Sequence, residues 1–298
     1  MFVLAHLSDV HLAPLPSINP LELISKRGLG FLNWLRKRHR IHRREVLDAL
    51  VADLKAQSYD HIAFTGDLVN LSLSNEFPRS RGWLEGLGAP DKVTFVPGNH
   101  DTYVRAVLGK PEQYWGDYMR GDAGESFPFV RKRGNVALIG LSTSLPTLPL
   151  AATGRLHSGQ LEKLGPILDT LGKEGFFRVI MIHHPPVQDA HHFRRLVDAA
   201  ELRDALREYG AELVLHGHHH EQSLVWLTGP RFSIPCVGVP SASNAPDRGD
   251  HPAGYNLYEI DGGPGEWRCT LVARGMSPST TSPGSTTITE TMRTELAN

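Results

Sequence analysis

Five short apolar stretches of this chain are each followed directly by a turn that contains Asp, Asn or His. We predict these stretches to be strands, because each is only four to six residues long, apolar and bounded by polar or glycine-containing residues. Amphipathic segments separate several of them, and this alternation is typical of a sheet whose strands are connected by helices. In chain order the turns are Asp9-Val-His11, Gly66-Asp67, Gly98-Asn99-His100-Asp101, His183-His184-Pro185 and Gly217-His218-His219-His220.

The predicted strands alternate with helices in the first part of the chain and follow one another directly in the last part. Strands are expected at Phe2–Leu7, His61–Thr65, Val93–Val96, Val136–Leu141, Arg178–Ile182 and Glu212–Leu215, with helices at Glu45–Gln57, Ser158–Leu171 and Ala199–Tyr209. After residue 221 four strands follow one another, at Ser223–Leu227, Phe232–Val239, Tyr255–Ile260 and Trp267–Ala273. This order predicts an α/β fold in one domain, residues 1–274, built as a layered sandwich with mixed β-sheets.

Two segments fall outside this scheme. Residues 275–298 have 11 Ser or Thr among the 22 positions from Ser277 onward, a composition that predicts a disordered tail. The other segment is a basic insertion of about residues 12–45. Its stretch Lys26–Arg44 carries eight Lys or Arg and no acidic residue, interleaved with Leu, Phe and Trp.

Three interpretations of the basic insertion stay open. It is a cap that offers Arg side chains to an anionic substrate, or a helix that lies on an anionic membrane surface. In the third interpretation it is a solvated basic helix whose apolar face packs on the domain. Gly28 and Gly30 disfavour one long helix in this segment.

Composition excludes several classes of protein. The net charge of −1 disfavours nucleic acid as a partner, and no apolar run approaches the ~20 residues that a membrane span needs. Two cysteines, Cys236 and Cys269, exclude a multi-disulfide scaffold, and we expect both to be reduced and buried. The first residues, Met1–His6, lack a basic leader and are predicted to be a strand, which favours a cytoplasmic protein.

The positions of the histidines indicate a metal site. In open α/β sheets ligands bind outside the carboxyl ends of the strands, so five turns there would bring their polar side chains to one edge. In Asp9-x-His11 and His218-x-His220 alternate residues point the same way, which lets both members reach one centre. Histidine is also the commonest metal ligand in proteins.

Together and in this order, the five motifs resemble the pattern D-x-H, G-D, G-N-H-D/E, H and G-H-x-H of the calcineurin-like metallophosphoesterase family. The resemblance implies that family's αββα sandwich and two metal ions that share one carboxylate. Such mixed oxygen and nitrogen ligands suit divalent or trivalent transition-metal ions, namely Mn, Fe or Zn. The implied ligands are Asp9, His11, Asp67 and His220 for one metal, and Asp67, Asn99, His183 and His218 for the other.

The resemblance also implies hydrolysis of a phosphoester. Two cations about 3.5–4 Å apart lower the pKa of a bridging water and stabilise both oxygens of an in-line displacement. His100 would protonate the leaving group or hydrogen-bond a phosphoryl oxygen. Many family members have Asp where this chain has Asn70, and an amide can orient His100 without stabilising its charged form. Asn70 and His184 are the expected substrate-binding residues.

We therefore expect a phosphodiesterase that acts on a small phosphoester of the cyclic-nucleotide or glycerophosphodiester type, through a metal-bridging hydroxide. Two alternatives stay open. The basic insertion suits a pyrophosphatase at the inner membrane surface that acts on a lipid-linked nucleotide such as UDP-diacylglucosamine. A non-catalytic metal-binding scaffold is the other, although a scaffold has no need to keep all seven ligands and His100.

Overall fold

Two six-stranded sheets form the centre of the computed structural model, which describes residues 1–188, 192–247, 251–278 and 286–296. The first sheet has the order β12-β11-β10-β1-β2-β3. Its strands β1, β2 and β3 are parallel, and β10, β11 and β12 extend it in antiparallel fashion. The strands are β1 (Phe2–Leu7), β2 (His61–Phe64), β3 (Val93–Phe95), β10 (Gly254–Asp261), β11 (Arg268–Pro278) and β12 (Thr286–Glu295).

The second sheet has the order β4-β5-β6-β7-β9-β8, with four parallel strands between two antiparallel edges. Its strands are β4 (Phe129–Arg133), β5 (Val136–Gly140), β6 (Phe177–Met181), β7 (Leu213–His216), β8 (Ser223–Thr228) and β9 (Ser233–Gly238). The motif turns follow the parallel strands β1, β2 and β3 of the first sheet and β6 and β7 of the second, so they emerge at the carboxyl ends of parallel strands.

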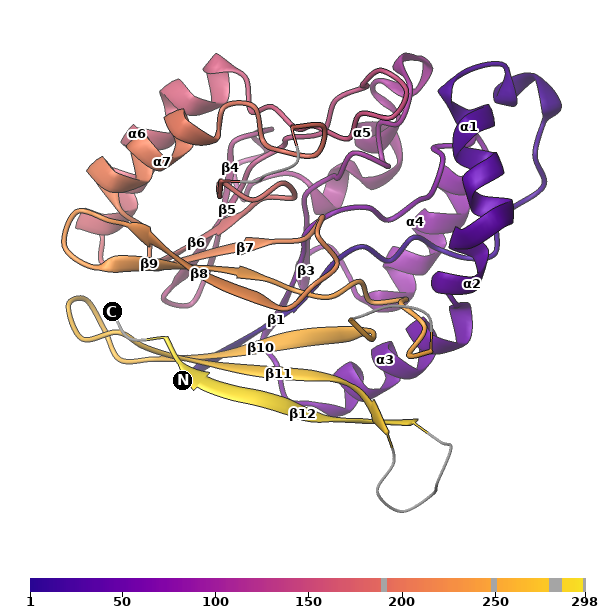
Figure 1. Ribbon diagram of the computed structural model, residues 1–298. Helices are drawn as coiled ribbons and strands as arrows, with labels where there is room; N and C mark the ends of the chain where they lie inside the picture. Colours follow the sequence, from indigo (N-terminus) through magenta and orange to yellow (C-terminus); the bar gives the residue numbers. More distant parts are fainter. Residues whose placement is uncertain (189–191, 248–250, 279–285, 297–298) are drawn as a thin grey trace.

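Helices cover the outer faces of both sheets (Figure 1). Helices α6 (Ser158–Lys173) and α7 (Ala199–Tyr209) pack on the second sheet, and α3 (Arg44–Ala56) and α4 (Glu76–Leu87) pack on the first. Strand β6 shows the layering: Val179 points into the core between the sheets and Ile180 into the core beneath α6 and α7, as the two-residue period of a strand requires. The predicted αββα sandwich with mixed sheets is confirmed.

Every predicted strand and helix is present, with ends displaced by a few residues, but other elements were not predicted. Helix α4 contains Pro78, Gly82 and Gly86, three residues of poor helix propensity that conceal it in the sequence. Strand β4 is largely basic, and the remaining short elements are η3 (Arg105–Val107), α5 (Lys110–Trp115) and η4 (Gly116–Tyr118). Cys236 and Cys269 are buried free thiols, as expected.

The basic insertion folds into four short helical pieces at one side of the molecule (Figure 1). They are η1 (Pro20–Leu23), α1 (Lys26–Asn33), the π-helical turn η2 (Trp34–Arg38) and α2 (His39–Ile41). Trp34 is only 7% exposed. Arg27 is buried as well, and it donates hydrogen bonds to the carbonyls of Leu71 and Ser72. These contacts hold the insertion against the body of the fold, beside the turn that follows β2.

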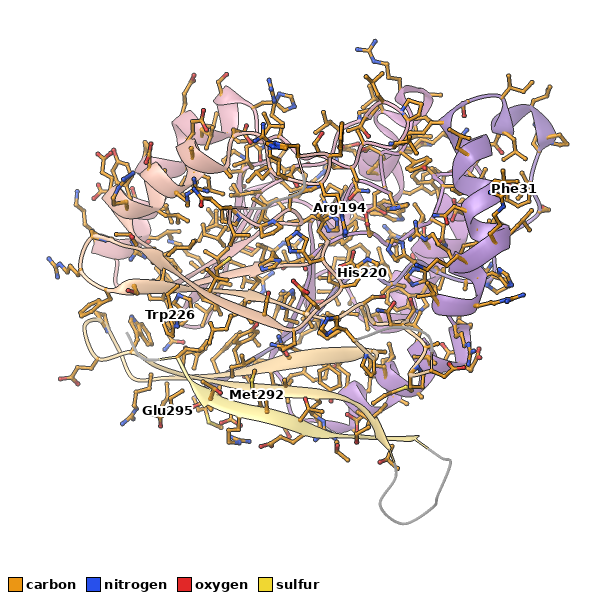
Figure 2. The ribbon with its side chains drawn as sticks, viewed as in Figure 1. Phe31, Arg194, His220, Trp226, Met292 and Glu295 are labelled. Carbon is orange, nitrogen blue, oxygen red and sulfur yellow. The ribbon has the colours of Figure 1, made fainter. Side chains whose placement is uncertain are left out.

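The prediction of a disordered tail after residue 274 is wrong for most of that segment. Residues 275–278 continue β11, and β12 pairs with β11 from Thr270↔Glu295 to Pro278↔Thr286. Met292 packs against the core, while Glu295 is at the outer edge of the sheet (Figure 2). Thr is β-branched and fits a paired strand well, which a count of apolar residues does not register. Residues 279–285 and 297–298 lie outside the described part of the chain.

Candidate metal centre

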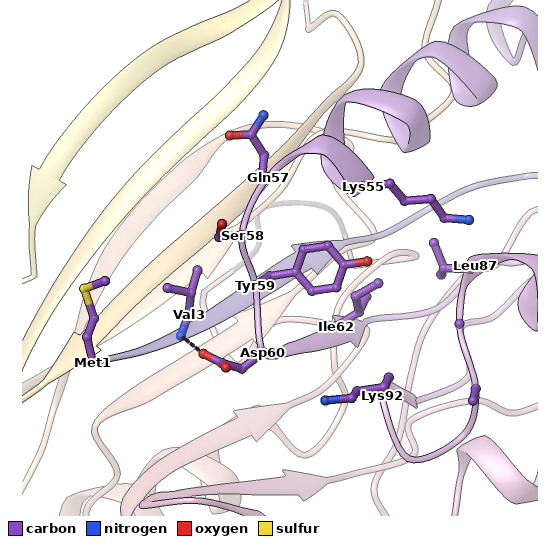
Figure 3. A pocket seen from close by; sticks show the side chains of 12 residues that line it. Met1, Val3, Lys55, Gln57, Ser58, Tyr59, Asp60, Ile62, Leu87 and Lys92 are labelled. Carbon is purple, nitrogen blue, oxygen red and sulfur yellow. Dashed lines mark hydrogen bonds between the residues drawn. The ribbon is translucent and has the colours of Figure 1, made fainter.

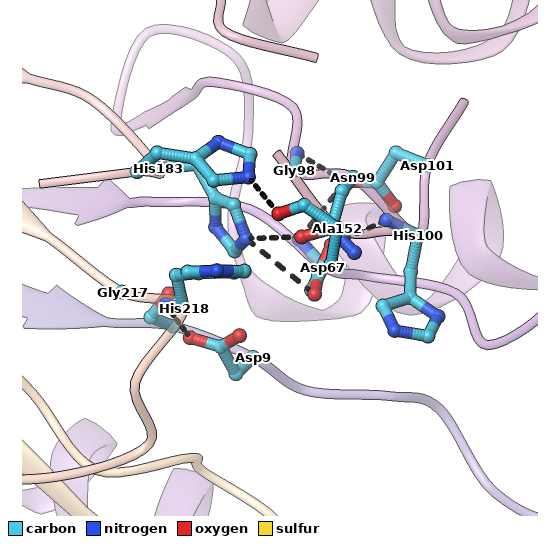
Figure 4. Close-up of polar contacts among 12 residues, drawn as sticks. Asp9, Asp67, Gly98, Asn99, His100, Asp101, Ala152, His183, Gly217 and His218 are labelled. Atoms are coloured by element: carbon cyan, nitrogen blue, oxygen red, sulfur yellow. Dashed lines mark hydrogen bonds and ion pairs between the residues drawn. The ribbon is translucent and has the colours of Figure 1, made fainter. Parts of the chain in front are cut away.

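Five motif turns meet at one edge of the sandwich, and direct hydrogen bonds fix them to each other (Figure 4). They are Asp9–His11, Gly66–Asp67, Gly98–Asp101, His183–Pro185 and Gly217–His220. The Asp9 amide donates to the Gly66 carbonyl at 2.9 Å, and the His11 amide donates to the Asp67 carbonyl at 2.9 Å. The His218 amide donates to Asp9 Oδ2 at 3.0 Å, which joins the last motif to the first. Segments more than 200 residues apart in sequence therefore form one rigid frame.

Four of the predicted ligands form the first cluster. The ligand atoms of Asp9, His11, Asp67 and His220 all lie within 4.8 Å of one another. His11 Nε2 is 3.3 Å from His220 Nε2 and 3.7 Å from Asp67 Oδ2, and His220 Nε2 is 3.0 Å from Asp9 Oδ1. Two ring nitrogens that face each other between two carboxylates fit the donor set of a transition metal.

A second cluster adjoins the first through Asp67. His183 Nε2 lies 3.2 Å from Asn99 Oδ1 and 3.5 Å from Asp67 Oδ2. The ring nitrogens of His183, His184 and His218 also lie within 4.8 Å of one another. Asp67 Oδ2 thus lies between His11 of the first cluster and His183 of the second. The structure brings the seven predicted ligands into two adjoining clusters, in which Asp67 lies next to both His11 and His183, and His218 lies with His183 and His184.

The backbone at these ligands is strained. Among the described residues eight non-glycine residues have positive φ, and five of them are predicted ligands. Such conformations cost about 1–3 kcal/mol each and persist where the surrounding structure enforces them, typically at functional sites. The five are Asp9 (φ 53°), His11 (φ 42°), Asp67 (φ 56°), His218 (φ 70°) and His220 (φ 59°).

Burial and charge set the protonation of the ligands. Burial alone would raise the pKa of Asp67, but the neighbouring His183 and His100 hold it well below its ordinary value. Burial opposes protonation of His183, yet the charge of Asp67 prevails and raises the pKa of His183 to about 9. The pKa of His11 lies well below its ordinary value because of burial and the nearby Arg38. The ligand carboxylates are therefore ionised, and metal binding would have to displace the proton of His183.

His100 is held by three hydrogen bonds. Its amide donates to Asp67 Oδ1 at 2.7 Å, its Nδ1 donates to the backbone carbonyl of Asn70, and its Nε2 accepts from Arg38 Nη1 at 2.9 Å. The Asn70 side chain points elsewhere, to the carbonyl of Leu12 at 3.2 Å. The expectation that this amide orients His100 is therefore wrong, since the backbone carbonyl does so. Burial and the charge of Arg38 lower the pKa of His100 to about 3.

His184 has both ring nitrogens engaged within the protein. Nδ1 contacts Thr143 Oγ1 at 2.7 Å and Nε2 contacts the Ala152 carbonyl at 3.1 Å, and the residue is completely buried. Here it ties the loop after β5 to the second cluster. Contact of His184 or Asn70 with substrate stays a prediction.

Three residues of the site had no role assigned from the sequence. Asp101 accepts four backbone N–H groups, including those of Asp67 (2.9 Å) and Gly98 (2.8 Å), and so fixes two motif turns together. Its place in the G-N-H-D motif was the available signal. His42 lies with its ring centroid 4.4 Å from that of His11, and its ligand nitrogen groups with those of His11 and His220. The third is Arg38, and the insertion's composition was the only signal for it and for His42.

A surface hollow of about 670 Å³ lies away from these clusters (Figure 3). It is at the amino-terminal edge of β1 and β2, where Asp60 Oδ2 accepts from the Val3 amide at 2.8 Å and Lys55 Nζ donates to the Gly86 carbonyl. Ligands of parallel sheets bind at the other edge. The hollow is therefore not the candidate site.

Comparisons with known proteins agree with this geometry. A bacterial relative from Synechococcus sp., named a probable cyclic nucleotide phosphodiesterase, is 28% identical over 232 residues, which are 75% of this chain and 80% of the relative. Among solved structures, a dimetal phosphatase from Danio rerio is similar with a TM-score of 0.61 and 14% identity, over 92% of this chain and 96% of that one. A purple acid phosphatase from yellow lupin has a TM-score of 0.54 and 12% identity, over 97% of this chain and 53% of that one.

These two solved structures show the fold alone, because their sequence identity is low. The family description is more direct, since the profile of the calcineurin-like phosphoesterases matches residues 2–222, which contain every motif turn. That match supports a phosphoester hydrolase that uses metal ions. The chain belongs to the calcineurin-like phosphoesterase family.

Proposed function

We propose that this protein is a phosphodiesterase with a binuclear metal centre, acting on a small diester of the cyclic-nucleotide or glycerophosphodiester type. The observation that carries the proposal is the position of Asp67, whose Oδ2 lies 3.7 Å from His11 Nε2 and 3.5 Å from His183 Nε2. One carboxylate between two sets of histidines is suited to bridge two ions. The relative from Synechococcus sp. supports the diester class.

The residues present fit two transition-metal ions, Mn, Fe or Zn. Asp9, His11, Asp67 and His220 would hold one, and Asp67, Asn99, His183 and His218 the other. When bound, such ions neutralise phosphate charge and lower the pKa of a water at the site. The strained turns and the Asp101 carboxylate hold these ligands in place.

His100 lies beside the first cluster, its ring centroid 4.8 Å from that of His11. Because Nδ1 is fixed to the Asn70 carbonyl, Nε2 is the atom available to a substrate. Nε2 is an acceptor in the neutral ring, so it would hydrogen-bond a phosphoryl or leaving-group oxygen when it carries a proton, which the negative charge of a bound phosphate favours. The ring stacks on Tyr103 at a centroid distance of 5.2 Å, which holds its plane.

The test is turnover by purified protein loaded with Mn, Fe or Zn. Bis(p-nitrophenyl) phosphate, p-nitrophenyl phosphate, a 3′,5′-cyclic nucleotide and a glycerophosphodiester would be compared, with bound metal measured in the same samples. We expect hydrolysis of the diesters to exceed that of the monoester. Two bound ions without turnover of any substrate would instead establish the scaffold alternative.

A second candidate function follows from the outer face of the basic insertion. Leu29, Leu32 and Leu35 are 54%, 44% and 53% exposed, and the exposed Arg36, Lys37 and Arg40 accompany them. Figure 2 shows Phe31 on this same side of the molecule. Apolar side chains among cations, without an acidic residue, are complementary to an anionic bilayer. No helix in the described residues is long and apolar enough to span a membrane.

Two loops extend this apolar face. Lys26 Nζ donates to Thr147 Oγ1 at 2.6 Å, which joins the insertion to the loop with the exposed Leu148 and Leu150. The Ala152 amide donates to the carbonyl of the exposed Phe193 at 2.7 Å. We propose from this continuity that the protein, in the cytoplasm, docks on the inner membrane surface to reach a lipid-linked phosphoester or pyrophosphate, for example UDP-diacylglucosamine.

Vesicle sedimentation tests the membrane proposal. We expect retention on vesicles that contain phosphatidylglycerol and none on phosphatidylcholine alone. Changing Leu32 and Leu35 to Ser, or Arg36, Lys37 and Arg40 to Ser, should abolish retention without changing turnover of a soluble diester. Equal sedimentation of these variants and the wild type would exclude the insertion as the docking surface.

A further inference from the structure

The basic insertion places the guanidinium of Arg38 against the metal centre. Arg38 ends the π-helical turn whose first residue is the buried Trp34, and its carbonyl accepts from the His42 amide at 2.9 Å. Its Nη1 lies 2.9 Å from His100 Nε2, and its Nη2 lies 3.5 Å from His42 Nε2. The rings of His100 and His42 both flank His11, with centroids 4.8 and 4.4 Å from it. The charge of Arg38 is thus adjacent to a predicted metal ligand.

Arg38 differs from Arg27, the other internal arginine of the insertion. Arg27 is fully satisfied: it donates to the carbonyls of Leu71 and Ser72 and forms an ion pair with Glu22 at 3.3 Å. Arg38 is partly buried, and among the described residues no carboxylate lies within ion-pair distance of its guanidinium. An arginine stays charged in proteins, and a desolvated charge without a counter-ion is costly.

Metal binding would reduce the negative charge near Arg38 further. Asp67 and Asp9 attract Arg38 at longer range. If those carboxylates coordinated cations, their negative charge would be neutralised, and Arg38 would then face positive ions and histidine rings. Glu76 also attracts Arg38 at longer range, and a ligand that enters from solvent would supply the negative charge in contact with the guanidinium.

We propose that Arg38 is a substrate-binding residue that donates hydrogen bonds to the non-bridging oxygens of the phosphoester. This proposal rests on the proposed phosphoesterase function and adds a residue from outside the motif turns. The planar guanidinium matches two phosphoryl oxygens, and charge-assisted hydrogen bonds of this kind are about twice as strong as neutral ones. A phosphate would therefore take the guanidinium from His100 and leave Nε2 of that ring facing the substrate.

Binding of inorganic phosphate tests the proposal without requiring turnover. Calorimetry on the Mn-loaded protein would compare the wild type with Arg38→Ala and Arg38→Gln, the second of which keeps most of the side-chain length but not the charge. We expect the Kd for phosphate to rise about 10- to 100-fold in both variants, the loss of a charge-assisted contact. Bound manganese, measured by elemental analysis, should stay at the wild-type level.

Arg36→Ala is the matched control, because Arg36 is an exposed arginine in the same turn and should leave phosphate binding unchanged. Wild-type phosphate affinity in either Arg38 variant, or loss of bound manganese from the Gln variant, would overturn the proposal. The proposed function fails separately. If the wild type binds phosphate through Arg38 but hydrolyses no ester, the proposed enzyme activity is wrong and the proposed anion site is retained.

Discussion

The motif turns and the basic insertion build the same site with opposite means. The motif turns contribute the ionised carboxylates of Asp9 and Asp67, buried imidazoles and five non-glycine residues with positive φ. The insertion has helical turns without a positive-φ non-glycine residue and contributes cations, with eight Lys or Arg and no acidic residue between Lys26 and Arg44.

The difference is one of ligand charge. The motif turns place negative and neutral donors around the positions where a cation would bind. The strained backbone of these turns orients the donors. The insertion brings positive charge to the rim of those points, where a phosphate bound to the metals would need it. In the proposed function the metals and the arginine would act on the same anion from different sides.

Among these variants Asp67→Asn should have the largest effect on metal affinity, and it tests the contribution of the motif turns. The amide has the same size but no charge, and both clusters lose their shared ligand. Since outer-shell changes already cost 10- to 100-fold in metal affinity, we expect a loss of more than about 100-fold here, together with loss of turnover. Elemental analysis and titration with Mn measure it.

Asp60→Asn is the control for this variant. Asp60 lies just before β2, at the opposite end of that strand from Asp67, and binds the Val3 amide. It should leave metal content unchanged. Full metal occupancy in the Asp67 variant would show that the carboxylate does not bridge.

His100→Asn separates substrate chemistry from metal binding within the motif turns. His100 contacts Asp67 through its backbone amide, which the substitution keeps, so both ions should stay bound. Loss of the imidazole should lower turnover by about 10²- to 10⁴-fold. The measurement is kcat with metal content determined in parallel. A fall in metal content equal to the fall in kcat would place His100 among the ligands instead.

Trp34→Ala tests whether the insertion is held as firmly as the motif turns. Trp34 is 7% exposed, and removing a buried Trp side chain costs about 3–5 kcal/mol in a packed core. We expect a loss of that order in the free energy of unfolding, measured in urea, with the metals retained and phosphate bound more weakly. Leu35→Ala, at 53% exposure, should change stability by less than about 0.5 kcal/mol. Equal effects of the two would mean a loosely attached cap.

The contrast also explains what could be predicted from the sequence. Strands such as β1 and the helices α6 and α7 show their period locally, so a layered α/β sandwich was predictable. The turn motifs are contiguous, and the family resemblance that they carry implied the αββα order and the seven ligands. The contact of Arg38 with His100 joins positions 62 residues apart. It depends on how the insertion packs around Trp34, which no local pattern encodes.

The same reason accounts for β12 and for Asn70. Thr286–Glu295 becomes a strand only because β11 offers it an edge, and isolated composition cannot report that edge. Asn70 was assigned from its spacing to Asp67, but its side chain donates to the Leu12 carbonyl, and its own backbone carbonyl holds the His100 ring instead.

The smallest expected effect concerns the pH dependence of stability. We expect the strands that carry the motif turns to make the folded protein sensitive to acid. His61 begins β2, and burial, with Arg133 and Arg131 adding to it, lowers its pKa from 6.5 to about 3. Between these values the unfolded chain binds a proton that the folded chain does not, so stability falls as pH decreases from 6.5 towards 3, by about 1.4 kcal/mol per pH unit. In His61→Gln this slope should be shallower by about that amount.

Urea denaturation of metal-free protein at pH 7, 6 and 5 measures the slope, and the difference between wild type and variant cancels the titration of the other groups. Gln keeps a donor for Thr94 Oγ1, which His61 Nε2 contacts at 2.7 Å. His39→Gln, on the exposed side of the insertion, is the comparison. If the His39 variant flattened the pH dependence as much as the His61 variant, acid sensitivity would belong to the insertion as well, and the strands beneath the motif turns would not be its source.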